Sequence, residues 1–347
     1  MGVTTETALQ FAPMVVVVSE ATQTPRFKNP LKRLQNTLQI CLHTNKLIRL
    51  NNGHVKFFHT QLHLKVDDLE DKVLPASCTT VGFNRNLEEL TLEATSQNYS
   101  LPESINRMDQ LKVLTIKGNC DHPSKLHNLS SIASLPNLTT IRFEHVSVPS
   151  LQPIFALKNL KQLSFVMCEM GDAFMSFTTY NMLPNLTHLE FDMCYDLKEL
   201  PSWIPNLARL QKLSITNCHE LDALPKELGC LSNLESLNLH SCTKLQELPA
   251  SIGSLRSLSY IDISDCLSIS VLPEEIGELC GLRVLKMNGC TGLQELPLST
   301  SELSQLEEVI CDEETSYLLM DIESGLHNLK INVVEDDRLE TFMKIVH

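Results

Sequence analysis

Apolar and polar residues follow one recurring pattern over most of this chain: leucines spaced as L-x-x-L-x-L, followed in the most regular part by a cysteine. Five successive intervals, from Leu186 to Leu306, are 24 residues long, and the others range from 20 to 27 residues. The short alternation predicts a strand with one apolar face in each segment. The regular interval indicates a repeat array rather than separate globular domains. Eleven segments fit the pattern, beginning at Leu87, Leu111, Leu138, Leu160, Leu186, Leu210, Leu234, Leu258, Leu282, Leu306 and Leu326.

Each repeat has a physical interpretation, which the segment beginning at Leu210 illustrates. Leu213 and Ile215 lie on one face of the expected strand, and Ser214 lies on the other. Pro225 ends extended structure because its φ is fixed and it has no amide donor. One such rung buries too little apolar surface to offset the conformational entropy of its residues, so neighbouring rungs must stack. The sequence therefore predicts an α/β fold, a leucine-rich-repeat solenoid (horseshoe) with one curved parallel sheet.

The pattern also predicts how the chain is divided. We expect a repeat domain over residues 61–334 with about 11 repeats, regular from 186 to 297. Within it, the alternation from Leu62 to Val66 predicts a strand that begins an N-terminal cap. Residues 1–60 show no repeat and are expected to be an irregular segment, either disordered or part of the cap. Residues 335–347 are expected to form an acidic tail.

Cysteines occupy one fixed position of the regular repeats. A small side chain there is expected to turn inward, pack as a hydrophobe and satisfy backbone groups at the end of the strand. Disulfides and zinc fit poorly, because in-register side chains point the same way and the chain has no C-x-x-C pair. We therefore predict reduced, buried thiols with a structural role. The column consists of Cys194, Cys218, Cys242, Cys266 and Cys290.

Composition and motifs exclude several classes of function. The chain has 42 acidic and 28 basic residues, a net charge of -14, which disfavours binding to nucleic acids or anionic membranes. It contains no phosphate-loop, dinucleotide-binding, nucleophile-elbow or zinc-protease motif, so we expect neither an enzyme nor a cofactor. No apolar run is long enough to span a membrane. The apolar stretch from Phe11 to Ser19 lacks the preceding basic residues of an export signal, so a cytoplasmic protein is expected, with the nucleus as an alternative.

The remaining candidate for function is the concave face, which we define as the strand side chains that point away from the core. Side chains vary there while the scaffold does not, as a protein-binding surface requires. Tyr260 is the expected anchor, flanked by Asp262 and Lys286. Tyr260 and Lys286 are both expected to point to solvent, so replacing both by Ala should leave the melting temperature nearly unchanged. The predicted partner-binding residues are His188, Glu190, Lys212, Asn238, His240, Tyr260, Asp262, Lys286 and Asn288.

The repeats resemble a known family. The segments LPNLTHLEFDMCYDLKELPSWI and LRSLSYIDISDCLSISVLPEEIGEL resemble the C-terminal half of plant nucleotide-binding leucine-rich-repeat immune receptors. KLHNLSSIASLPNLTTIRFEHVSVP, beginning at Lys125, is similar to their helper branch. The resemblance implies contacts with an immune receptor's nucleotide-binding domain or with lipase-like signalling proteins. It does not imply nucleotide exchange or pore formation, because the chain carries neither the nucleotide-binding nor the coiled-coil domain of that family.

Two other functions fit a leucine-rich-repeat chain. An F-box adaptor of a ubiquitin ligase also uses cysteine-bearing repeats, but residues 1–60 do not show an F-box helix set. An extracellular leucine-rich-repeat receptor or inhibitor would show an export signal, paired capping cysteines and a different repeat consensus. The sequence therefore favours an intracellular protein-binding module of the immune-receptor type.

Overall fold

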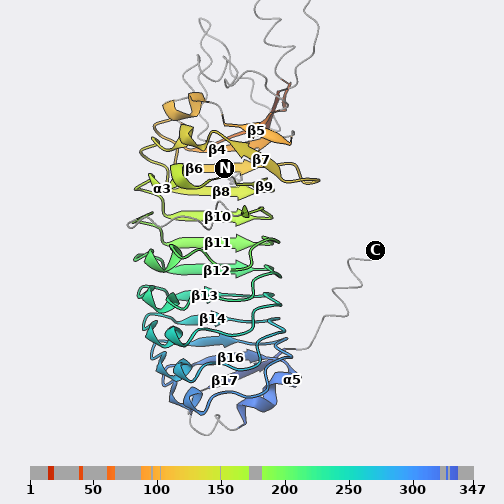
Figure 1. Cartoon of the computed structure of the whole chain (residues 1–347), viewed down its shortest axis with the longest axis vertical. Helices are drawn as coiled ribbons and strands as arrows, with labels where there is room; N and C mark the ends of the chain where they lie inside the picture. The colour runs from red at the N-terminus through yellow and green to blue at the C-terminus, as the bar shows by residue number, and fades with distance from the viewer. Residues whose placement is uncertain are drawn as a thin grey trace, which may run out of the picture.

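The computed structural model describes residues 15–18, 39–41, 61–66, 87–94, 97–101, 103–148, 150–171, 182–320, 326 and 329–334. One continuous sheet of 14 strands runs along the molecule, in the order β17-β16-β15-β14-β13-β12-β11-β10-β8-β6-β4-β3-β1-β2. Its strands lie one above another along the long axis (Figure 1). The strands of this sheet are β1 (Val15–Val18), β2 (Gln39–Cys41), β3 (Gln61–Val66), β4 (Glu89–Ala94), β6 (Val113–Lys117), β8 (Thr140–Glu144), β10 (Gln162–Val166), β11 (His188–Asp192), β12 (Lys212–Thr216), β13 (Ser236–Asn238), β14 (Tyr260–Asp262), β15 (Val284–Lys286), β16 (Glu308–Cys311) and β17 (Lys330–Val333).

The predicted solenoid is confirmed. From β4 to β16, each strand of the sheet begins two residues after the leucine that opens its repeat. Neighbouring strands pair in parallel from β1 and β3 through to β17, so the repeats stack in register. The strand expected at Leu62–Val66 is present as β3. β1 joins the sheet in parallel beside β3, and β2 pairs with it antiparallel, so that end of the sheet is not purely parallel.

Short helical segments return the chain from one strand to the next. They are mostly short turns of 3-10 helix, each of three to five residues. Pro249 and Pro273 stand at the N-caps of two of them, in extended conformation. The 3-10 segments are η2 (Glu103–Arg107), η3 (Leu129–Ile132), η4 (Ile204–Asn206), η5 (Leu228–Cys230), η6 (Ala250–Ser254), η7 (Glu274–Glu278), η8 (Leu298–Glu302) and η9 (Tyr317–Leu319), and the α-helical turns are α3 (Gln152–Phe155) and α5 (Glu313–Ser316).

A second, three-stranded parallel sheet accompanies the N-terminal repeats, whose lengths are irregular. It contains β5 (Asn98–Ser100), β7 (Ser124–His127) and β9 (Val146–Ser147). The prediction of a single sheet missed it, because these strands follow the main strands and lie outside the leucine pattern. Their own alternation was the available signal: Leu126 of β7 is buried, while Lys125 and His127 beside it are exposed.

The core is a stack of aliphatic side chains with an aromatic segment in its N-terminal half. In the rung that begins at Leu210, both inward strand residues and the cysteine are fully buried. Phe143, Phe165 and Phe191 occupy the same inward position of three successive rungs. Their rings stack with centroid separations of 5.4 Å in both pairs. This continuous interior holds the strands at fixed register, so the outward side chains have fixed relative positions.

Every regular repeat bends sharply just before its column cysteine. The residue at this corner has a positive φ, which turns the chain out of the strand. Met193, Asn217, Ser241 and Asp265 adopt φ values of 52°, 55°, 58° and 58° there. Gly289 has a φ of 75° at the same position. The corner directs the cysteine inward and leaves the strand side chains on the concave face.

Candidate functional site on the concave face

Strand register brings the predicted binding residues together on β11 to β15. One row across the strands contains His188, Lys212, Ser236, Tyr260 and Val284 in successive pairing. A second row contains Glu190, Ser214, Asn238, Asp262 and Lys286. His240 and Asn288 each lie two residues beyond the second row, on the chains that leave β13 and β15. Because neighbouring strands are roughly 4.8 Å apart, side chains in one row contact their neighbours directly.

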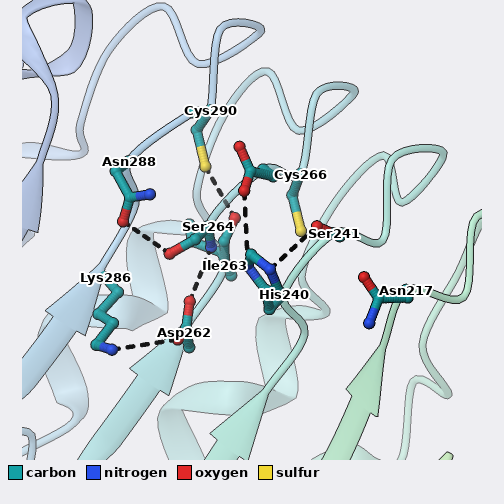
Figure 2. A network of polar contacts seen from close by, with 12 residues as sticks. Asn217, His240, Ser241, Asp262, Ile263, Ser264, Cys266, Lys286, Asn288 and Cys290 are labelled. Atoms are coloured by element: carbon teal, nitrogen blue, oxygen red, sulfur yellow. Dashed lines mark hydrogen bonds and ion pairs between the residues drawn. The ribbon is translucent and has the colours of Figure 1, made fainter. Parts of the chain in front are cut away.

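Asp262 is the centre of a polar network on this face. Its Oδ2 accepts a hydrogen bond from the Tyr260 hydroxyl at 2.9 Å, and its Oδ1 accepts one from the backbone amide of Ser264 at 3.0 Å. The Lys286 ammonium lies 3.7 Å from Oδ2 and 5.6 Å from the centre of the Tyr260 ring. Figure 2 shows Lys286 and Ser264 on two sides of Asp262. The carboxylate therefore fixes an aromatic and a cationic side chain at once.

This network corrects the expectation that Tyr260 and Lys286 point freely to solvent. Asp262 is buried, with only 6% of its surface exposed, and Tyr260 and Lys286 are both half-buried around it. Burial raises the pKa of the Tyr260 phenol, and its hydrogen bond to Asp262 adds to the effect. Partial burial alone would lower the pKa of Lys286, but its contacts with Tyr260 and Asp262 outweigh that and raise it. Replacing Tyr260 and Lys286 together must therefore also affect stability.

A second set of polar contacts lies at the ends of the same strands. The Ser264 hydroxyl donates to Asn288 Oδ1 at 2.9 Å, and the backbone amide of His240 donates to Asn238 Oδ1 at 3.1 Å. The His240 ring lies 3.2 Å from the Ser241 hydroxyl, on the side away from the Asp262 network (Figure 2). These bonds hold Asn238 and Asn288 in defined orientations beside the network.

The N-terminal side of the face is a charged cluster that only partly follows the prediction. Glu190, which was predicted, forms an ion pair with Arg142 at 3.2 Å across the intervening strand β10. Arg142 also pairs with Glu144 at 2.7 Å, and Lys117 pairs with the same carboxylate at 2.7 Å. Partial burial opposes ionisation of Glu144, but the two cations outweigh it and lower its pKa. Because the short Ser164 separates Arg142 from Glu190, a long side chain can reach over the strand.

His188 and Lys212 lie beside each other in the first row. Lys212 is exposed, whereas His188 is half-buried, with its Nδ1 2.8 Å from the Thr187 hydroxyl. Burial lowers the pKa of His188, and the neighbouring Lys212 ammonium adds to this. Asp192, on the same strand as His188, accepts hydrogen bonds from Thr216 and Asn217 of the next rung. This edge of the face is therefore held by bonds between rungs.

The column cysteines lie inside the solenoid and not on this face. Each is fully buried, and each thiol donates to a backbone carbonyl of the preceding rung. The distance from Sγ to that carbonyl oxygen is 3.2 Å for Cys242, 3.1 Å for Cys266 and 2.9 Å for Cys290. Burial raises the pKa of the Cys242 thiol to about 12. Among the residues that the structure describes, no group of three His, Cys, Asp or Glu side chains is placed to hold a metal ion.

Comparisons with known proteins show which curated proteins this chain is similar to. The chain is 43% identical over 146 residues to a protein of Arabidopsis thaliana named probable disease resistance protein At5g66890. It is 40% identical over 192 residues to probable disease resistance protein At5g66900, and 39% identical over 144 residues to disease resistance protein ADR1, both also from Arabidopsis thaliana. Its curated relatives are plant disease resistance proteins. The resemblance found in the sequence is thereby confirmed.

The chain spans only part of the length of the curated relatives that it matches. The three alignments cover 42%, 54% and 41% of this chain, and 35%, 22% and 18% of the respective relatives. No family model matches the chain.

Among solved structures, a chain of the Toll–Spätzle complex of Drosophila superposes with a TM-score of 0.51 at 13% identity, covering 82% of this chain and 44% of that one. That likeness supports the fold alone. In the described part of the chain, no helix has the length and apolarity needed to cross a bilayer.

The sequence analysis did not predict an asparagine column that joins the rungs of the solenoid. In each of four rungs, an asparagine side-chain amide donates to a backbone carbonyl of the preceding rung at 2.7 Å. The four residues are Asn137, Asn159, Asn185 and Asn233. The signal was present as L-x-N-L, in which the asparagine precedes the leucine that opens a repeat.

Proposed function

We propose that this chain is a protein-binding leucine-rich-repeat module of a plant immune receptor, and that it binds its partners through the concave face of β11 to β15. The repeat domain spans residues 61–334 in this proposal, with residues 1–60 and 335–347 outside it. No catalytic step is assigned to the chain. The partner classes follow from the family resemblance: the nucleotide-binding domain of an immune receptor or a lipase-like signalling protein.

The observation that carries this proposal is the ordered network around Asp262. Tyr260 and Lys286 are held in place before any partner arrives, so little side-chain entropy is lost on binding. Tyrosine is also enriched among residues that dominate interface energies. In the first row, Ser236, which has a short side chain, lies next to Tyr260. In the second row, Ser214 lies next to Asn238. The short side chain of Ser236 leaves room for a partner side chain to approach the fixed tyrosine.

The free thiols support a reducing compartment. Ten cysteines of the described residues are free, and Cys120, Cys230 and Cys280 among them are exposed. Exposed thiols without disulfides are typical of cytosolic and nuclear proteins. We therefore place the proposed function in the cytoplasm, with the nucleus as an alternative, and rank an extracellular receptor lower. No observation in this structure specifically favours an F-box adaptor.

Binding assays with two matched tryptophan variants test the proposal. The immobilised full chain is exposed to a recombinant nucleotide-binding domain of a plant immune receptor and to purified lipase-like signalling proteins. Ser236→Trp fills the concave face at β13, whereas Ser254→Trp places the same group on η6, outside the sheet. We expect Ser236→Trp to weaken binding at least about tenfold and Ser254→Trp to leave it unchanged. Equal affinities of the two variants, or loss only with Ser254→Trp, would place the binding surface elsewhere.

A further inference from the structure

The two asparagines beside Asp262 present hydrogen-bond donors to the concave face. Asn238 Oδ1 is occupied by the His240 amide, and Asn288 Oδ1 is occupied by the Ser264 hydroxyl. Figure 2 shows the Asn288 oxygen turned to Ser264 and its nitrogen turned away. Neither NH2 group has an acceptor among the described residues. Because a carboxamide has one acceptor end and one donor end, fixing the oxygen inward leaves the donor end for a ligand.

Lys286 adds a cationic donor between these asparagines and the tyrosine. Its side chain is 32% exposed, whereas that of Asp262 is 9% exposed, so a partner meets the ammonium and not the carboxylate. Both oxygens of Asp262 already accept hydrogen bonds, from Tyr260 and from the Ser264 amide. The 3.7 Å between Lys286 and Asp262 is longer than a hydrogen bond, so the ammonium keeps donor capacity. The accessible polar groups immediately around Asp262 are therefore hydrogen-bond donors, one of them cationic, although the chain as a whole carries a charge of -14.

Apolar side chains lie directly beside these donors. Val284 pairs in register with Tyr260, and Ile310 pairs in register with Lys286. Val284, Ile310 and the Tyr260 ring are all half-buried, so each keeps part of its surface for contact. An acceptor bound at Lys286 would thus have Ile310 one strand spacing away, roughly 4.8 Å, on one side, and Val284 on the same strand two residues earlier, with Tyr260 in register beside Val284.

We propose that this part of the concave face recognises an acidic side chain of a protein partner, an Asp or Glu whose neighbours in an extended segment are apolar. The carboxylate accepts hydrogen bonds from Lys286 Nζ and Asn288 Nδ2, a backbone carbonyl of the segment accepts one from Asn238 Nδ2, and the apolar neighbours cover Val284, Tyr260 and Ile310. The single negative charge of a carboxylate matches the single accessible ammonium of Lys286. A phosphate would carry a second negative charge, which would lie near Asp262 with no second cation to balance it. This assignment rests on the proposed function and names the partner chemistry of the same face.

Labelled peptides test the chemistry directly. The probes are heptapeptides with Glu or Asp at the centre and Leu, Phe or Ile on either side, each with a matched Gln or Asn peptide and a matched phosphoserine peptide. Fluorescence polarisation measures their affinity for the full chain. We expect the acidic peptides to bind at least about fivefold more tightly than their amide counterparts and more tightly than the phosphoserine peptides. Lys286→Met should remove the preference for acid over amide, and Lys286→Arg should retain it.

The variants separate failure of this inference from failure of the proposed function. Thermal melts first establish that each variant is folded, and Asn288→Ala replaces Lys286→Met if the latter unfolds. Three outcomes overturn the carboxylate assignment: equal binding of Glu and Gln peptides, tighter binding of the phosphoserine peptide, or a preference for acid over amide that survives Lys286→Met, or Asn288→Ala where it takes the place of Lys286→Met. If Ser236→Trp still abolishes binding of the protein partner in that case, the proposed function stands and only the ligand chemistry is wrong. If Ser236→Trp leaves both the protein and the peptides bound, the concave face itself is wrong.

Discussion

The Tyr260 hydroxyl donates a 2.9 Å hydrogen bond to Asp262, a carboxylate that is almost fully buried. Replacing Tyr260 and Lys286 together by Ala leaves this carboxylate with the Ser264 amide as its remaining partner. We expect the double variant to lose about 1–3 kcal/mol of unfolding free energy, because a buried charge is left undersatisfied. Urea denaturation followed by circular dichroism measures it. Ser236→Ala is the control, since that side chain lies on the same face outside the network, and a double variant as stable as this control would contradict the role of Asp262.

The asparagine column should stabilise the array. Asn233→Ala removes the 2.7 Å hydrogen bond from Nδ2 to the carbonyl of Ala208 in the preceding rung. We expect a loss of about 0.5–1.5 kcal/mol in unfolding free energy, the usual net value of one such bond. Ser232→Ala, one residue earlier and exposed, is the matched control and should change stability by less than about 0.5 kcal/mol. Equal denaturation midpoints for the two variants would show that the column is dispensable.

The cysteine column should make the fold sensitive to alkali. Burial raises the pKa of Cys242 from its ordinary value of 9.0 to about 12. Between these two values the unfolded thiol has lost its proton while the folded thiol keeps it, so stability falls as the pH rises. One such group contributes a slope of up to about 1.4 kcal/mol per pH unit.

Cys242→Ala isolates this contribution. The variant should be about 1–3 kcal/mol less stable at pH 7, because it loses packing and the thiol donor to the Ile215 carbonyl. Between pH 9 and pH 11 its unfolding free energy should fall less steeply than that of the parent chain. Denaturation curves at four pH values measure both quantities. Parallel pH profiles for parent and variant would mean that the thiol does not remain protonated in the folded state.

The repeat interval and the inward leucines were sufficient to predict the solenoid, because stacking leaves few alternatives for such a sequence. The same register predicted which residues share the concave face. It did not predict that Asp262 would be buried, since this depends on the larger Tyr260, two residues earlier on the same strand, and Lys286, on the neighbouring strand, folding over it. Nor did it predict the ion pair between Arg142 and Glu190, which are 48 residues apart and on non-adjacent strands.

The second sheet shows a different limit. Strands β5, β7 and β9 lie in repeats whose lengths differ, so they have no common position in the leucine pattern. Short strands without a fixed period are weak signals when each is read alone. Their pairing becomes evident only when the main sheet has already placed the rungs side by side.

The central claim, that partners bind the concave face, is tested most directly by site-specific photo-crosslinking. The photoreactive residue p-benzoylphenylalanine replaces either Ser236 on β13 or Ser254 on η6, and each chain is irradiated with the nucleotide-binding domain or lipase-like protein that binds the parent. Mass spectrometry then identifies the crosslinked peptides. We predict crosslinks from position 236 and none from position 254. Crosslinks from position 254 alone would contradict the account, because they would place the partner on the helical segments instead of the sheet.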